Sequence, residues 1–192
     1  MLDLDTLLER CREGDDLAWE AFVRRFQGRV FGIAVHYLRD REEARDAAQD
    51  IFIKVYHHFR KSPERIPEER AFLPWLLRLS RNACVDRLRR LKVRRPEGPT
   101  VPVEDAADVA DSVPSLDESL VSGSRRALVH RALAMLSEKN REVILLKDIQ
   151  ELKLEEISEL LGVPVGTVKS RTSRARVELA RAVQSLDPSY GV

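Results

Sequence analysis

The chain has 192 residues, of which 43% are hydrophobic and 34% charged, a composition that fits a folded protein of one large or two small domains. Aromatic residues make up only 6%, and Ala, Leu, Arg and Glu dominate, which favours helices over strands. No run approaches the roughly 18 apolar residues of a membrane span, and the first residues lack a secretion signal, so we expect a cytoplasmic protein without membrane insertion. Cys11 and Cys84 form no Cys/His cluster, and we expect neither a metal site nor a cofactor.

The net charge of +1 is unevenly distributed along the chain. Residues 1–95 carry 21 basic and 16 acidic side chains, whereas residues 96–122 carry seven acidic and no basic ones. Residues 123–192 carry 12 basic and nine acidic side chains. The two basic segments suit a polyanion, because each Lys or Arg placed on a phosphate releases counterions, but solvated charged faces are also common.

The composition between the basic segments predicts a linker. Residues 94–122 hold four prolines and the seven acidic residues, and proline blocks the continuation of a helix. We therefore expect an all-α fold of two small helical domains, residues 1–93 and 123–186, joined by a flexible acidic linker.

Capping signals predict the first three helices of the N-terminal domain. The first helix is expected to end at Gly14, and either Asp15 or Asp16 is expected to cap the second. Asp40, with Glu43 three residues later, opens the third helix as a variant of the capping box. Apolar residues recur on one side of that helix and predict its buried stripe: Ala44, Ala47, Ala48, Ile51, Phe52, Val55, Tyr56 and Phe59.

A fourth helix is predicted from about Phe72 to Leu91, after a charged connection at residues 61–69. Proline is comfortable only in the first turn of a helix, so Pro74 places the expected start near Leu73.

The C-terminal domain also has the pattern of four helices. The four helices are expected at about residues 124–136, 138–150, 153–161 and 165–184, and Ser137 is expected to cap the second of them.

Residues 154–171 have the pattern of a helix-turn-helix. Ile157, Leu160 and Leu161 form one apolar face, Gly162 allows a tight turn, and Pro164 precedes the next helix. We expect two apolar residues of the second helix to face the core, Val168 and Val177. Its exposed face then carries Lys169, Ser170, Arg171, Thr172, Arg174 and Arg176.

A basic helix after such a turn is suited to the major groove of DNA, where Arg and Lys reach guanine edges or phosphates. The alternative is an ordinary helical hairpin with a solvated basic face. The turn together with five basic residues on one helix favours DNA binding.

These residues resemble region 4 of the extracytoplasmic-function (ECF) sigma factors of the sigma-70 family, over Leu154-Glu-Glu-Ile, Val163-Pro-Val-Gly-Thr-Val-Lys-Ser-Arg and Arg174-Ala-Arg. Residues 136–146 resemble the preceding family segment, with Ser137 and Glu138 in place of its usual proline start. The resemblance implies that the last helix contacts the −35 promoter element through Thr167, Lys169, Ser170, Arg171, Arg174 and Arg176.

The N-terminal half resembles region 2 of the same family, over Asp46-Ala-Ala-Gln-Asp-Ile-Phe-Ile-Lys-Val-Tyr and residues 72–90. The resemblance implies that Asp46, Gln49 and Asp50 bind core RNA polymerase at its β′ clamp helices. These three residues lie opposite the apolar stripe, so we expect them to be free to meet a basic partner. The implied contacts to the −10 element, with capture of a flipped base, are Asn82, Arg78, Arg81 and Arg87.

Several alternatives remain open in region 2 and the linker. Each arginine of the fourth helix can instead be part of a solvated face. For Phe72 and Trp75 we favour a core role over a contact with the DNA strand. The acidic linker is either a simple tether or, by analogy with the family, an RNA mimic in the polymerase channel.

The resemblance as a whole implies a transcription initiation factor without catalysis of its own. Its partners would be promoter DNA, the β′ clamp helices and β flap of core polymerase, and an anti-sigma factor. One rival is a stand-alone helix-turn-helix regulator, but no dimerisation helix is evident. The other rival, an enzyme, is disfavoured because the four histidines show no ligand spacing.

Overall fold

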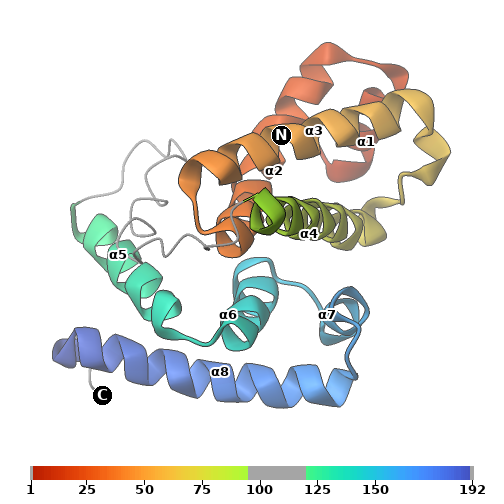
Figure 1. Ribbon diagram of the computed structural model, residues 1–192. Coiled ribbons are helices and arrows are strands. Elements are labelled where there is room, and N and C mark those ends of the chain that lie inside the picture. Colours follow the sequence, from red (N-terminus) through yellow and green to blue (C-terminus); the bar gives the residue numbers. More distant parts are fainter. Residues whose placement is uncertain (1, 95–119, 191–192) are drawn as a thin grey trace. The chain divides into compact units, whose positions relative to one another are not determined.

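The computed structural model describes residues 2–94 and 120–190 (Figure 1). These residues contain helices and no strand, which confirms the all-α class. In chain order the elements are α1 (Leu4–Glu13), α2 (Asp16–Leu38), α3 (Arg41–Lys61), the 3₁₀ turn η1 (Pro63–Arg65), α4 (Glu69–Arg94), α5 (Leu120–Met135), α6 (Glu138–Ile144), the π-helical turn η3 (Leu145–Ile149), α7 (Leu154–Leu161), α8 (Val165–Leu186) and η4 (Pro188–Tyr190). None of the described helices is long and apolar enough to span a membrane.

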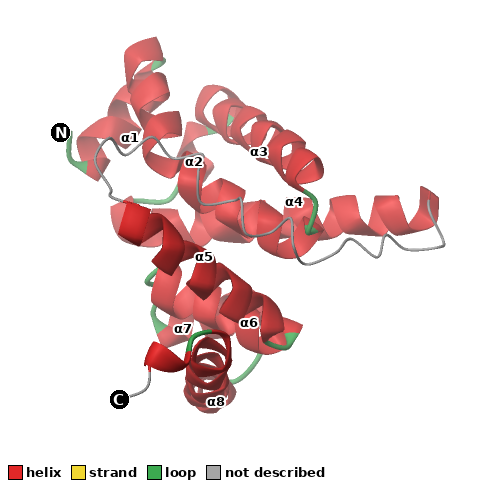
Figure 2. Cartoon of the chain, turned by 90° about the vertical axis from the view of Figure 1, so that its left-hand side faces the viewer, coloured by secondary structure: helices red, strands yellow, loops and turns green. Residues whose placement is uncertain are grey.

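The chain forms two compact units, one built from α1–α4 and the other from α5–α8. Figure 2 shows short loops joining the helices within each unit. Helix α4 extends to Arg94, and α5 begins at Leu120, about four residues earlier than expected. Apart from its two ends, the predicted acidic linker lies outside the described residues.

The expected caps hold the first three helices. Gly14 ends α1 with a left-handed φ of 87°, and Asp15 accepts hydrogen bonds from the backbone N–H groups of Leu17 (2.9 Å) and Ala18 (3.1 Å). Asp40 accepts one from the N–H of Glu43 at 2.9 Å. These local contacts confirm the boundaries predicted between α1, α2 and α3.

Aromatic side chains form the centre of the N-terminal unit, where α2 packs against α3 and α4. The ring of Phe22 is fully buried, and its centroid lies 5.0 Å from Trp19, 4.9 Å from Phe26, 5.6 Å from Phe59 and 5.7 Å from Phe72. The apolar stripe of α3 faces inward as predicted, with six members buried and Phe52 and Tyr56 half-buried. Burial of this stripe fixes the exposed side of α3.

The start of α4 differs from the prediction. The helix begins at Glu69, so Pro74 lies in its second turn rather than its first. Proline there removes one hydrogen bond, the bond to the carbonyl of Arg70. The turn is retained because Phe72, Leu76 and Leu77 are fully buried and hold it against the core. Phe72 is thus a core residue, as favoured from the sequence.

Helix α8 is the centre of the C-terminal unit and packs against α5, α6 and α7. The guanidinium of Arg141 donates to three carbonyl oxygens at the end of α5, those of Leu133 (2.9 Å), Ala134 (3.0 Å) and Leu136 (2.9 Å). These bonds help to satisfy carbonyl groups at the end of a helix, where the regular backbone pattern runs out of donors. Arg141 therefore fixes the angle between α5 and α6.

One local prediction for the C-terminal unit, the capping bond of Ser137, is wrong. Ser137 occupies the N-cap position of α6, but its side chain makes no capping bond. Glu178 of α8 accepts from its backbone N–H instead (3.4 Å) and from the amide of Asn140 (2.5 Å). The helix expected over residues 138–150 runs without a break to Ile149, and its last five residues form the π-helical turn η3, which is followed by a left-handed φ of 62° at Glu151.

Candidate nucleic-acid and polymerase interfaces

The turn between α7 and α8 has the geometry of a helix-turn-helix. Gly162 ends α7 with a φ of 66°, and its N–H donates to the carbonyl of Ser158 at 2.9 Å. The Ser158 hydroxyl donates in turn to the carbonyl of Val163 at 2.6 Å. Pro164 lies at the N-cap of α8. The sequence therefore produces this turn through local bonds, and α8 begins directly after it.

The buried face of α8 differs in part from the predicted one. Val168 is fully buried, but Val177 is 53% exposed, because the two are nine positions apart, which corresponds to two and a half turns and places them on opposite sides. Thr172 was expected on the exposed face but is buried, with its hydroxyl donating to the carbonyl of Val168 at 2.9 Å. Thr172 and Ala175 therefore complete the inward side of α8.

The predicted −35 residues lie on two flanks of α8. Thr167, Ser170, Arg171 and Arg174 follow the spacing i, i+3, i+4, i+7 and share one flank, which we call the reading flank. Ser170 and Arg174 are exposed, and Thr167 and Arg171 are half-buried. Lys169 and Arg176 are separated by seven residues and share the other flank.

Arg176 has a partner within the protein. Its guanidinium donates to the carboxylate of Asp148 in η3 through Nε at 3.1 Å and through Nη2 at 2.5 Å. This hydrogen bond and the charge of Asp148 raise the pKa of Arg176. The bidentate contact holds Arg176 against the π-helical turn, which distinguishes it from Arg174 on the reading flank.

A pocket of about 570 Å³ lies between α3, the following turn and α4. Helix α3 contributes a stripe at helical spacing: Lys54, His57, His58 and Lys61. Ser62 and Arg65 follow from the turn, and α4 contributes Trp75, Arg78, Leu79, Asn82, Ala83 and Asp86. The wall thus combines an aromatic face, an amide and several cations, all of which are groups that bind single-stranded nucleic acid.

The pocket brings together two of the four predicted −10 residues, Arg78 and Asn82. Arg81 instead donates from Nε to the hydroxyl of Tyr37 in α2 at 2.9 Å, and its guanidinium lies 5.7 Å from the centre of that ring. Trp75, favoured as a core residue, is only half-buried, and its ring lies nearly perpendicular to that of His58 at a centroid distance of 5.6 Å.

Sequence analysis did not assign the pocket residues of α3. The signal was available as two stripes, one on each helix, with Lys54 to Lys61 on α3 and Trp75, Leu79, Asn82 and Asp86 on α4. The sequence does not show that these two stripes line the same pocket, because this depends on how α3 and α4 pack against each other.

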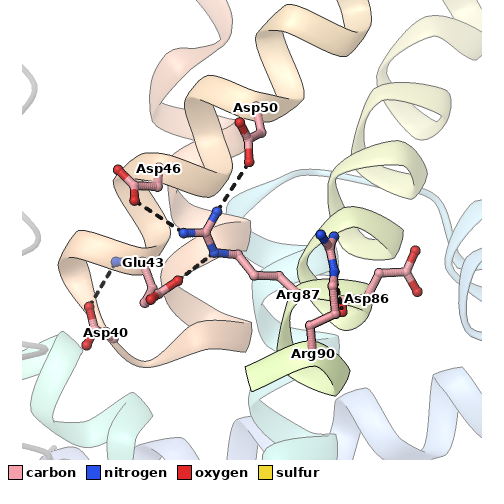
Figure 3. Close-up of polar contacts among 7 residues, drawn as sticks. All are labelled: Asp40, Glu43, Asp46, Asp50, Asp86, Arg87 and Arg90. Carbon is pink, nitrogen blue, oxygen red and sulfur yellow. Dashed lines mark hydrogen bonds and ion pairs between the residues drawn. The ribbon is translucent and has the colours of Figure 1, made fainter. Parts of the chain in front are cut away.

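Arg87, the fourth predicted −10 residue, is the centre of an ion cluster between α4 and α3 (Figure 3). Nε donates to Glu43 at 2.5 Å, and the two Nη atoms donate to Asp46 and Asp50, each at 3.2 Å. The Arg87 side chain is only 22% exposed. Burial lowers its pKa, but the Glu43 hydrogen bond and the three carboxylate charges outweigh burial and raise it.

The predicted polymerase-binding residues are therefore not all free of internal partners. Asp46 and Asp50 each form an ion pair with Arg87, which corrects the sequence expectation. The reason is that residues 43, 46 and 50 share the side of α3 that faces α4. Both aspartates remain more than 60% exposed, and Gln49 is also exposed, so the face stays accessible. Three carboxylates against one guanidinium leave this face acidic.

Replacing Arg87 with methionine is expected to lower the free energy of unfolding of the α1–α4 unit by about 1–3 kcal/mol. The change removes three charged hydrogen bonds and leaves three carboxylates close together on α3. Chemical denaturation of the full chain measures the effect. The loss should shrink as salt is added, because part of the cluster is exposed and is therefore screened.

Arg89→Met is the matched control on the same helix. Arg89 is 77% exposed and contacts Asp86 at 3.5 Å, so its loss should change stability by less than about 0.5 kcal/mol. Equal effects of the two substitutions would show that the Arg87 cluster does not stabilise the unit.

Comparison with known proteins shows the same two units. Residues 22–94 match the family description "Sigma-70 region 2", and residues 126–179 match "Sigma-70, region 4". The RNA polymerase sigma-H factor of Pseudomonas aeruginosa is 31% identical over 185 residues, covering 94% of this chain and 93% of that protein. The ECF RNA polymerase sigma factor SigW of Bacillus subtilis is 32% identical, covering 93% of this chain and 96% of that protein.

Solved structures share the fold. The structure of CnrH in complex with the cytosolic domain of CnrY matches with a TM-score of 0.60 and 23% identity over 95% of this chain and 99% of the other. The sigma factor RpoE in complex with the anti-sigma factor NepR from Bartonella quintana matches with a TM-score of 0.59 and 21% identity over 86% of this chain and 96% of the other. With both regions matched and relatives above 30% identity along nearly the whole length, the chain belongs to the sigma-70 family and is an RNA polymerase sigma factor of the ECF type.

Proposed function

We propose that this sigma factor directs core RNA polymerase to promoters through three surfaces: the acidic face of α3, the α3–α4 pocket and the reading flank of α8. The observation that carries the proposal is the pocket, where Trp75, Arg78 and Asn82 share one wall opposite the cations of α3. In this mechanism the protein binds and positions DNA and has no catalytic step of its own.

The pocket is suited to a base flipped out of the −10 element. Flipping costs a few kcal/mol, and stacking on an aromatic ring together with hydrogen bonds to the base edges offsets this cost. The half-buried ring of Trp75 can stack, and the amide of Asn82 both donates and accepts hydrogen bonds. Lys54, Lys61 and Arg65 provide positive charge for the strand backbone.

The reading flank of α8 is suited to the major groove of the −35 element. The turn at Gly162 leaves the N-terminal half of α8 projecting with Thr167, Ser170, Arg171 and Arg174 on one side. Arginine reaches guanine edges or phosphates, and the N–H groups at the start of the helix can meet a phosphate. Lys169 would contact the backbone from the other flank. Arg176 would serve mainly to hold α8 on η3.

The acidic face of α3, formed by Asp46, Gln49 and Asp50, would bind a basic surface of core polymerase, and we assign it to the β′ clamp helices. Because Arg87 ties this face to α4, it would also connect polymerase binding with the helix that contacts the −10 strand. The C-terminal unit would contact the β flap.

Control by a protein inhibitor is part of the proposal. Two proteins of the same fold, CnrH and the sigma factor RpoE, were solved with partner proteins, and the partner of RpoE is described as an anti-sigma factor. An inhibitor that covers the acidic face of α3 and the reading flank of α8 would prevent both polymerase and promoter binding. We place these interactions in the cytoplasm, where core polymerase and promoters are found.

Run-off transcription with purified bacterial core polymerase over genomic fragments from the host tests the function. The chain is expected to produce new start sites preceded by a shared −35/−10 pair. Asn82→Ala is expected to lower open-complex formation roughly 10-fold, through the loss of about 1–2 kcal/mol of base contacts, while −35 binding is retained.

Gln27→Ala removes an exposed amide of α2 outside the pocket and serves as the matched control. Its transcripts should equal those of the unchanged protein. Intact duplex binding without association with core polymerase or any transcript would contradict the proposal and would favour a stand-alone regulator.

A further inference from the structure

Among the described residues that line the α3–α4 pocket, Asp86 supplies the one carboxylate. The other charged lining groups are cations: Lys54, Lys61, Arg65 and Arg78. A carboxylate repels the phosphates that such a wall attracts, so its presence lowers general affinity for a strand. In such a wall a carboxylate is suited to meet a hydrogen-bond donor of a base and not a phosphate.

The contacts of Asp86 leave its carboxylate available for such a role. Its ion pair with Arg89 is long, at 3.5 Å, and the two side chains are 61% and 77% exposed. The hydrogen bond from Arg90 goes to the backbone carbonyl of Asp86. Figure 3 shows the carboxylate directed away from Arg87 and its three acidic partners. The Asp86 side chain is therefore not part of the Arg87 cluster.

Asn82 and Asp86 are one helical turn apart on α4 and line the same pocket. An ionised carboxylate only accepts hydrogen bonds, whereas the neighbouring amide both donates and accepts. Adenine, cytosine and guanine each carry an exocyclic amino group that can donate to Asp86. Thymine carries no amino group, and its single donor, N3–H, lies between two carbonyl oxygens that repel a carboxylate.

We propose that Asp86 makes the pocket select a base with an exocyclic amino group and reject thymine. The proposal rests on the proposed function, because it assigns base preference to the same pocket. Asp86 is a specificity-determining residue in this scheme. It lowers the general affinity of the pocket for a DNA strand and increases the discrimination between bases.

The test uses holoenzyme assembled from the full chain and bacterial core polymerase. It is mixed with fork-junction DNA whose single-stranded non-template −10 positions are randomised, and the bound DNA is sequenced. The unchanged protein should deplete thymine at one position by roughly 5-fold or more, the discrimination typical of a good base contact. Asp86→Asn should reduce this depletion to less than about 2-fold, because an amide can also donate to the carbonyl oxygens of thymine.

Total DNA retention separates this role from simple damage to the fold. Removing a negative charge from a basic wall should leave retention unchanged or raise it, even as discrimination is lost. Asp5→Asn, which changes an exposed carboxylate of α1, should alter neither quantity. At the selected position, a base analogue that lacks the amino group, such as purine for adenine, should weaken binding of the unchanged protein but not of Asp86→Asn.

Two results would overturn the inference: no position at which thymine is depleted, or depletion that persists in Asp86→Asn. Trp75→Ala and Asn82→Ala in the same assay distinguish a failure of the proposed function of the pocket from a failure of the role assigned to Asp86. If both leave the recovered sequences and retention unchanged, no base enters the pocket, and the proposed function of the pocket fails together with the selection. If they weaken binding while Asp86→Asn keeps the thymine depletion, only the role of Asp86 is lost.

Discussion

Replacing Phe22 with alanine is expected to lower the free energy of unfolding of the α1–α4 unit by about 3–5 kcal/mol. Phe22 is fully buried and lies within 6 Å, centroid to centroid, of the rings of Trp19, Phe26, Phe59 and Phe72. Truncation removes its own burial and leaves a cavity that five surrounding rings, including Phe52, cannot readily fill. The free energy of unfolding of a domain is only about 5–15 kcal/mol, so this substitution would remove a large part of the stability of the α1–α4 unit.

Hydrogen exchange of the full chain, followed by mass spectrometry, measures this loss separately for peptides of α2–α4 and of α8. The N-terminal peptides should lose protection and the α8 peptides should keep it. Promoter opening should fail, while binding of duplex −35 DNA is retained. The functional consequence is expected because the α3 face and the α3–α4 pocket both depend on this core.

Leu17→Ala is the control on the same helix, since Leu17 is 73% exposed and its truncation should cost less than about 0.5 kcal/mol. If Phe22→Ala unfolded no more readily than this control, the aromatic cluster would not be the core of the unit. A loss of protection shared equally by the α8 peptides would show instead that the two units unfold together.

Replacing Arg171 and Arg174 together with glutamine is expected to weaken −35 binding by roughly 10²-fold or more, since each base contact of an arginine contributes about 1–3 kcal/mol. Both residues lie on the reading flank of α8, and the Nε of Arg174 has only a long 3.4 Å contact with its own helix at the carbonyl of Ser170. Glutamine keeps much of the side chain but removes the charge.

Titration of a labelled −35 duplex at several salt concentrations measures both the affinity and its salt dependence. The slope of log K against log[salt] should fall by about 0.9 for each arginine that contacts a phosphate. An arginine that contacts a guanine edge should instead show its effect as reduced discrimination between duplex sequences. The pair of measurements thus separates positioning contacts from base contacts.

Arg181→Gln removes an exposed arginine near the C-terminal end of α8, beyond the reading flank, and should weaken binding little. Arg176→Gln should also act weakly on DNA, because Arg176 already pairs with Asp148. An equal loss for Arg181→Gln and for the double variant would contradict the assignment of the reading flank and would indicate a general effect of net charge.

Much of the fold follows from the sequence because its signals are local. A cap such as Asp15 or Asp40 acts on N–H groups two or three residues away, and Gly14 and Gly162 end helices through their own φ. The apolar stripe of α3 likewise depends only on the 3.6-residue repeat. One helix limit was wrong where packing overrides local preference, at Pro74 in α4.

The partners of the arginines were decided by tertiary structure alone. Arg81, Arg87 and Arg176 look alike in the sequence, as basic residues on exposed-looking helices, yet each reaches a different element: Tyr37 of α2, the carboxylates of α3, and Asp148 of η3. A long side chain with five donors can reach several neighbours, and the packing of helices far apart in the sequence determines which one is within hydrogen-bond distance.

The sequence by itself therefore determined the helices, the helix-turn-helix and the family, because periodicity, caps and turn residues act within a few positions of one another. Only the tertiary structure decided that Lys54, His58, Trp75 and Asn82 share one pocket, and that Arg87 belongs with Asp46 and Asp50. The physical reason is that a site between two helices depends on how their faces are rotated toward each other. That rotation is set by burial of the whole aromatic core and not by any local stretch of residues.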